Sequence, residues 1–122
     1  MLRKIAYIAG VIAMLGAPSF AQGTGPNGGL VAGAGSHKTE LVVSPTELVV
    51  YLLEDGKAHE SKGATLRAVV QQGGKTSTVN FADKDGERLV GKLQAPLSKG
   101  AIVVVTGKDS HGDQFNARYV IN

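Results

Sequence analysis

The three histidines are the side chains in this sequence with the clearest capacity for chemistry. They are His37, His59 and His111, and no two have the i, i+2 or i, i+4 spacing of a local metal-binding motif. Asp109 and Asp113 flank the last of them. Neutral imidazole and carboxylate oxygen together form a ligand set that suits Zn²⁺ or Cu²⁺. A metal site therefore requires a fold that brings these separate segments together.

The pattern of apolar residues predicts that the fold is all-β. Apolar and polar residues alternate with a period of two, as in Leu41 and Val43 with Glu40 and Val42, and no segment sustains a helical period. Asp-Gly and Gly-Gly pairs supply the positive φ that tight turns need. We expect seven strands, at 38–43, 46–53, 64–71, 75–82, 87–93, 101–107 and 114–121. These predict an antiparallel β-sandwich of immunoglobulin type, with a small closed barrel as the alternative.

This architecture places the three histidines at one end of the domain. The start of the first strand, the connection between the second and third strands and the last hairpin meet there, and these positions hold His37, His59 and His111. The carboxylates expected near this end are Asp55, Glu60, Asp109 and Asp113. We therefore predict a Zn²⁺ or Cu²⁺ site made of the three histidines, with Asp109 and Asp113 as weaker ligands. His37 and His111 form the better pair, because first and last strands are often neighbours. The alternative is three separate, solvated loop histidines.

The first 21 residues are typical of a secretory signal peptide. Arg3 and Lys4 precede an apolar run at 5–17, and Ser19-Phe20-Ala21 places small residues at a cleavage site before Gln22. The apolar run is shorter than the roughly 20 residues of a membrane-spanning helix. We expect a periplasmic or secreted protein with no membrane span after cleavage.

The remaining chain divides into a Gly-rich flexible arm, 22–36, with a short edge strand at 30–32, and a β-sandwich domain, 37–122. Without Arg3 and Lys4, 11 basic residues stand against 10 acidic ones. This near-neutral balance argues against nucleic acid and anionic lipid as partners. Cysteine is absent, which excludes disulfides, thiolate catalysis and Cys-type zinc sites.

No motif indicates catalysis. The segment 23–28 reads G-x-G-x-x-G, but neither the strand before it nor the helix after it that phosphate binding requires is expected here. The chain has no G-x-S-x-G nucleophile motif. We predict that the protein is not an enzyme. Val49, Tyr51 and Val69 have the parity of outward strand positions, and would form a docking patch if they cluster.

Two groups of segments resemble a known family. The run 48–57, which contains an Asp-Gly-Lys turn, with 63–66 and 86–91, is similar to small exported bacterial immunoglobulin-like domains. Pro26-Asn27-Gly28-Gly29, followed by His37 and Glu40, resembles the periplasmic domains associated with heavy-metal efflux adaptor subunits. The resemblance implies an immunoglobulin-like fold and a link to metal efflux.

Two functions are compatible with these observations. The first is a periplasmic binding or accessory domain that handles Zn²⁺ or Cu²⁺ in efflux or envelope stress. The second is a metal-free interaction or structural domain of the cell envelope, with an envelope protein as its partner. The sequence leaves the oligomeric state open.

Overall fold

The computed structural model describes residues 23–122, so the expected signal peptide, residues 1–21, lies outside the described part. Eleven strands and no helix make up the regular structure of these residues, which thus contain no helix able to cross a membrane. The strands are β1 (Gly23–Thr24), β2 (Leu30–Ala34), β3 (His37–Val43), β4 (Glu47–Glu54), β5 (Lys57–His59), β6 (Thr65–Gln72), β7 (Lys75–Asn80), β8 (Ala82–Lys84), β9 (Arg88–Lys92), β10 (Ile102–Lys108) and β11 (Gln114–Val120).

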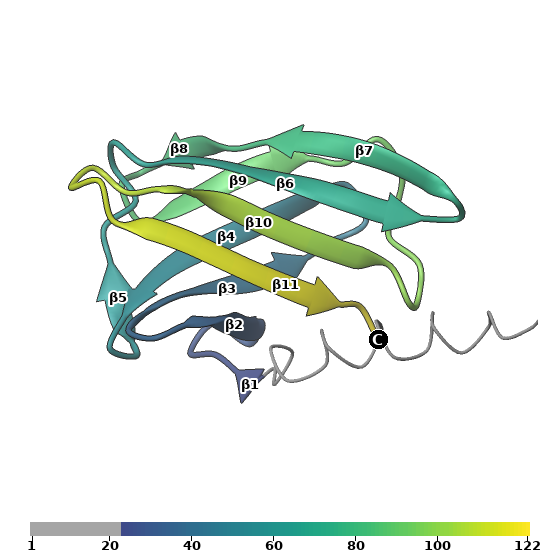
Figure 1. Cartoon of the computed structure of the whole chain (residues 1–122). Coiled ribbons are helices and arrows are strands. Elements are labelled where there is room, and N and C mark those ends of the chain that lie inside the picture. The colour runs from purple at the N-terminus through teal and green to yellow at the C-terminus, as the bar shows by residue number, and fades with distance from the viewer. Residues whose placement is uncertain (1–22) are drawn as a thin grey trace, which may run out of the picture.

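The strands form two antiparallel sheets that face each other (Figure 1). The larger sheet has the order β1-β2-β3-β4-β9-β8, with the short strand β5 also paired to β4. The smaller sheet has the order β11-β10-β6-β7. The strand β11 packs beside β2 and β3, and β7 lies near β9, so the two sheets approach each other at both edges.

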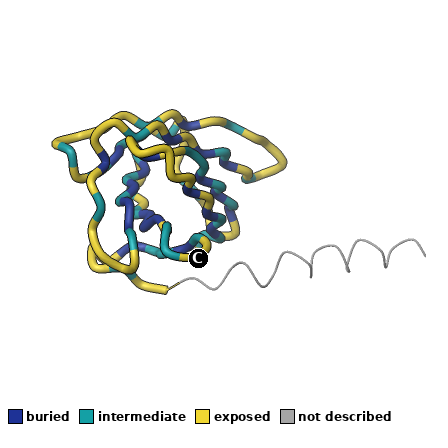
Figure 2. The backbone as a smooth tube through the Cα atoms, turned by 60° about the vertical axis from the view of Figure 1, so that its left-hand side comes forward, coloured by how far each residue is buried: buried dark blue, intermediate teal, exposed yellow. Residues whose placement is uncertain are grey.

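A single apolar core fills the space between the sheets. Buried and more exposed positions alternate along the chain (Figure 2). On β6, Leu66, Ala68 and Val70 are buried between more exposed neighbours. This period of two follows from the strand backbone, which turns successive side chains to opposite faces. The aromatic rings of Phe115 and Tyr119 extend into the core from β11 and are fully buried.

The all-β fold and the antiparallel pairing confirm what the alternating pattern predicts. Each of the seven expected strands is present, within about two residues at each end. The Asp-Gly turns also have the expected geometry, because Asp55 and Asp85 both have positive φ, at 53° and 56°. The structure adds the three short strands β1, β5 and β8, and the edge strand expected at 30–32 is present as β2. Within the segment 22–36, expected to be an arm, β2 pairs along β3 from Leu30↔Leu41 to Ala34↔His37.

Glu40 is fully buried although it lies on the opposite face of β3 from the core residue Leu41. The turn between β1 and β2 covers it. Its Oε2 accepts hydrogen bonds from the backbone N–H groups of Asn27, at 2.8 Å, and Gly29, at 2.7 Å, and its Oε1 accepts one from Asn27 Nδ2 at 3.0 Å. A Cβ atom at Gly25 would lie 2.3 Å from the Glu40 carboxylate carbon, so only glycine fits there. Glu40 thus anchors the first turn to the larger sheet.

Candidate metal centre

Three chain segments meet at one end of the two sheets. His37 is the first residue of β3, and His59 is the last residue of β5, where it pairs with Leu52 of β4. Asp109, His111 and Asp113 belong to the hairpin between β10 and β11 (Figure 1). The fold therefore brings all three histidines to the end at which the sequence places them.

Gly63 allows the connection after β5 to approach the β10–β11 hairpin closely. Its φ is +81°, a conformation that glycine adopts readily and other residues rarely do. A Cβ atom at this position would lie 2.9 Å from Cβ of Ser110, inside the normal contact distance. A side chain at position 63 would therefore collide with the hairpin that carries Asp109 and His111.

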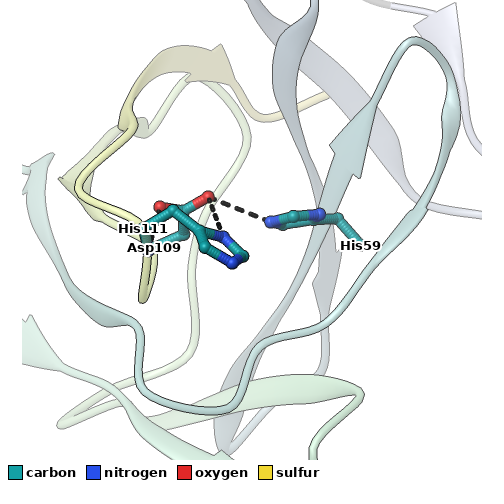
Figure 3. Close-up of side chains that lie close together, drawn as sticks. All are labelled: His59, Asp109 and His111. Carbon is teal, nitrogen blue, oxygen red and sulfur yellow. Dashed lines mark hydrogen bonds and ion pairs between the residues drawn. The ribbon is translucent and has the colours of Figure 1, made fainter.

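The carboxylate of Asp109 is the centre of the cluster (Figure 3). Its Oδ2 lies 2.9 Å from Nε2 of His59 and 3.9 Å from Nδ1 of His111. Its Oδ1 accepts hydrogen bonds from the backbone N–H groups of His111, at 2.9 Å, and Asp113, at 2.8 Å. The Asp109 side chain is completely buried, whereas the side chains of His59 and His111 are 15% and 62% exposed. One carboxylate oxygen thus shapes the hairpin, and the other faces two imidazoles.

Asp109 remains an ionised carboxylate despite its burial. Burial favours the neutral acid, but hydrogen bonds from the Asp113 N–H, the His59 ring and the His111 N–H outweigh that effect. Together they hold the pKa of Asp109 below its ordinary value. A negative, pre-positioned oxygen between two imidazoles is what a cation site needs.

Glu54 lies between His59 and His37 and contacts both rings. It is the last residue of β4, and its Oε1 lies 3.2 Å from Nδ1 of His59. Its Oε2 lies 3.8 Å from Nε2 of His37. Glu54 is not among the site residues that the sequence predicts. The signal that could have found it is its place directly before the Asp55-Gly56 turn, which folds β5 back so that His59 lies over the end of β4.

His37 and Asp113 form a second pair at this end. Nε2 of His37 lies 3.6 Å from Oδ2 of Asp113, and the His37 ring meets the Phe115 ring edge-on with centroids 5.2 Å apart. Within residues 23–122, however, the group whose ligand atoms all lie within 4.8 Å of one another is His59, Asp109 and His111. The predicted set of five is therefore divided in two, and the imidazoles that share one carboxylate are His59 and His111.

The apolar positions considered for a docking patch lie apart. Val49 and Tyr51 belong to β4 in the larger sheet, and Val69 belongs to β6 in the smaller one. All three are half-buried. Because the fully buried neighbours on β4 are Leu48 and Val50, the side chains of Val49 and Tyr51 point away from the core. These residues therefore lie on the outer faces of two different sheets and do not form one patch.

Comparison of the chain with protein-family models, curated proteins and solved structures finds no match. The resemblance to exported domains linked to metal efflux therefore stays a prediction. The geometry of the histidine cluster is therefore the basis for inferring a function of this chain.

Proposed function

We propose that this chain is an exported, non-enzymatic binding domain that holds one divalent metal ion, Zn²⁺ or Cu²⁺, at His59, Asp109 and His111. The observation that carries the proposal is the convergence of two imidazoles, one from the end of β5 and one from the β10–β11 hairpin, on one buried and ionised carboxylate. Buried charges in proteins are paired or bind metals, because an isolated buried charge is costly.

The donor set and its spacing suit these ions. Two imidazole nitrogens and one carboxylate oxygen are ligands of Zn²⁺ and Cu²⁺, and three protein ligands leave a fourth position for water or a partner's side chain. Because the His111 side chain is 62% exposed, that fourth position would open to solvent. Ligand atoms on one tetrahedral ion lie about 3.3–3.6 Å apart, given bonds of about 2.0–2.2 Å. The contacts of 2.9 Å and 3.9 Å to Asp109 bracket this spacing.

Glu54 supports the same arrangement from the far side of His59. Its Oε1 lies 3.2 Å from Nδ1, so it would favour the tautomer of a metal-bound His59 that keeps the proton on Nδ1 and uses Nε2 as the ligand atom. Metal-binding histidines commonly donate their second N–H to a carboxylate, which fixes the orientation of the ring. On binding, the ion would replace the hydrogen bond between Nε2 of His59 and Oδ2 of Asp109.

The wider role follows from the N-terminal sequence and from the family resemblance. We place the protein in the periplasm, as an immunoglobulin-like accessory domain of metal efflux or envelope stress. The two antiparallel sheets support this fold assignment. A metal-free interaction domain of the envelope is the outcome that remains if no ion binds.

Calorimetric titration of residues 22–122 with Zn²⁺ and Cu²⁺ tests the proposal. We expect binding at micromolar or lower concentration and a metal-dependent rise in the melting temperature, because a ligand that binds only the folded state stabilises it. His111→Ala, at an exposed side chain, removes one ligand and should weaken binding by tenfold or more. Glu60→Ala removes an exposed carboxylate next to His59 in the sequence and serves as the control. Equal affinity for His111→Ala and the native chain would overturn the proposal.

A further inference from the structure

We infer that a second divalent cation of the same class binds between His37, Glu54 and Asp113, beside the first. These residues come from the start of β3, the end of β4 and the β10–β11 hairpin. Nε2 of His37 faces one carboxylate oxygen from each of the other two, at 3.8 Å from Glu54 and 3.6 Å from Asp113. One imidazole nitrogen and two carboxylate oxygens form a common three-ligand set for Zn²⁺.

Nε2 of His37 is a buried polar atom without a hydrogen-bond partner. The other ring nitrogen, Nδ1, has a partner, because Oγ of Ser36 lies 3.3 Å away. The edge-on contact with Phe115 holds the ring in place from the core side. A buried polar atom that lacks a partner in a native fold requires an explanation. A cation would supply one here, because it would accept the lone pair of Nε2 and attract the two carboxylates that lie 3.8 Å and 3.6 Å from that atom.

The two contacts of His37 are near the spacing of ligands on one ion, whereas the ligand oxygens of Glu54 and Asp113 lie more than 4.8 Å apart and must move closer together. Two ligand atoms on one ion with bonds of about 2.0–2.2 Å lie about 3.3–3.6 Å apart at the tetrahedral angle. The two contacts of His37 exceed this range by at most a few tenths of an ångström. Glu54 and Asp113 have side chains that are 43% and 48% exposed, so their carboxylates are free to close on an ion while His37 stays fixed.

The charge at this end of the domain also favours a second cation. Glu54, Asp109 and Asp113 carry three negative charges when ionised, and one divalent ion neutralises two of them. Glu54 directs its Oε1 to His59 and its Oε2 to His37, so a single carboxylate orients the ligands of both ions. The inference goes beyond the proposed function, because the second site shares no direct ligand with the first and can be filled without it.

The number of bound Zn²⁺ ions per chain tests the inference, measured by calorimetry and by metal analysis after dialysis of residues 22–122. We expect two ions for the native chain. Asp113→Asn should leave one, because the amide removes the charge but keeps the backbone N–H that bonds Asp109. His37→Ala should do the same, and His111→Ala should spare the second ion. Asp55→Asn, which removes a neighbouring charge at a turn residue with φ 53°, is the control and should keep both ions.

The outcomes separate this inference from the proposed function. If the native chain binds one ion, and that ion is lost in His111→Ala but kept in both Asp113→Asn and His37→Ala, the second site is overturned and the first is supported. If the native chain binds one ion that is kept in His111→Ala but lost in Asp113→Asn and His37→Ala, the second site is supported and the first is overturned. No ion bound by the native chain overturns both. Thermal melts of each variant without metal show whether it is folded before its ions are counted.

Discussion

Nε2 of His59 lies 2.9 Å from Oδ2 of Asp109, which links β5 to the β10–β11 hairpin across 50 residues of chain. This hydrogen bond holds the end of β5 against the hairpin through side chains of the chain itself. The same contact makes Asp109 both a structural residue and a proposed ligand, and the variants below separate these two roles.

Asp109→Ala should lower the free energy of unfolding of the metal-free protein by about 1–3 kcal/mol. The substitution leaves the N–H groups of His111 and Asp113 without their acceptor and removes the partner of His59. His111→Ala, at an exposed side chain, should change the same quantity by less than about 0.5 kcal/mol. Urea unfolding without metal measures both. Equal stability of the two variants would contradict the structural role of Asp109.

Gly63→Ala should both destabilise the fold and weaken metal binding. The added Cβ would lie 2.9 Å from Cβ of Ser110 and push His59 away from the hairpin. Gly100→Ala is the matched control, because Gly100 also has positive φ, at +91°, but has open space around it. In both variants, backbone strain at positive φ should lower the free energy of unfolding by about 1 kcal/mol. Only Gly63→Ala should raise the dissociation constant for Zn²⁺, and a rise of the same size in Gly100→Ala would argue against the close-approach explanation.

Glu40→Gln should loosen the first turn without affecting the histidine cluster. In the native chain, three N–H groups donate to the two carboxylate oxygens of Glu40. The amide of glutamine has only one acceptor oxygen for these three donors. We expect a loss of about 1–3 kcal/mol in the free energy of unfolding and faster hydrogen exchange at the Gly29 amide. The same change at Glu47, which is only half-buried, is the control. Unchanged exchange at Gly29 would show that Glu40 does not anchor this turn.

Tyr119 should make the protein less stable at high pH. Burial raises the pKa of Tyr119 far above its ordinary value of 10, against the opposing effect of the Thr39 hydrogen bond. Above about pH 10 the unfolded chain loses the tyrosine proton while the folded chain keeps it. The free energy of unfolding should then fall by up to about 1.4 kcal/mol per pH unit.

Urea unfolding between pH 8.5 and pH 11 checks this slope. Tyr119→Phe should remove most of it, although it costs stability at every pH, because the Tyr119 hydroxyl donates to the buried Thr39 carbonyl at 2.6 Å. Tyr51→Phe makes the same chemical change outside the core and should keep the slope. If the slope survives in Tyr119→Phe, the titrating group lies elsewhere.

The sequence predicts the local features of this fold well, and the long-range ones less well. Strand positions depend on the alternation of neighbouring residues, and the turns at Asp55 and Asp85 depend on adjacent pairs, so both can be recognised locally. The burial of Glu40 depends instead on a turn 11–15 residues earlier that folds over it. Nothing in the alternation around Glu40 distinguishes it from a solvated outward residue.

In the candidate site, too, some features can be predicted from the sequence and others depend on long-range contacts. The end of the domain that holds the three histidines follows from strand order alone. The pairing within it does not, because the short hairpin that carries β5 back along β4 sets the direction of His59. Strand order favours His37 with His111, whereas the register of β4 with β5 and the close contact at Gly63 bring His59 to His111. The role of Glu54 depends on the same register.

The most direct test of the central claim is an NMR titration of residues 22–122 with Zn²⁺ that follows the imidazole nitrogens. We expect the resonances of Nε2 of His59 and Nδ1 of His111 to shift when Zn²⁺ binds between these residues and Asp109, and Nδ1 of His59 to keep its proton toward Glu54. Imidazole resonances that stay unchanged through a tenfold excess of Zn²⁺ would contradict it.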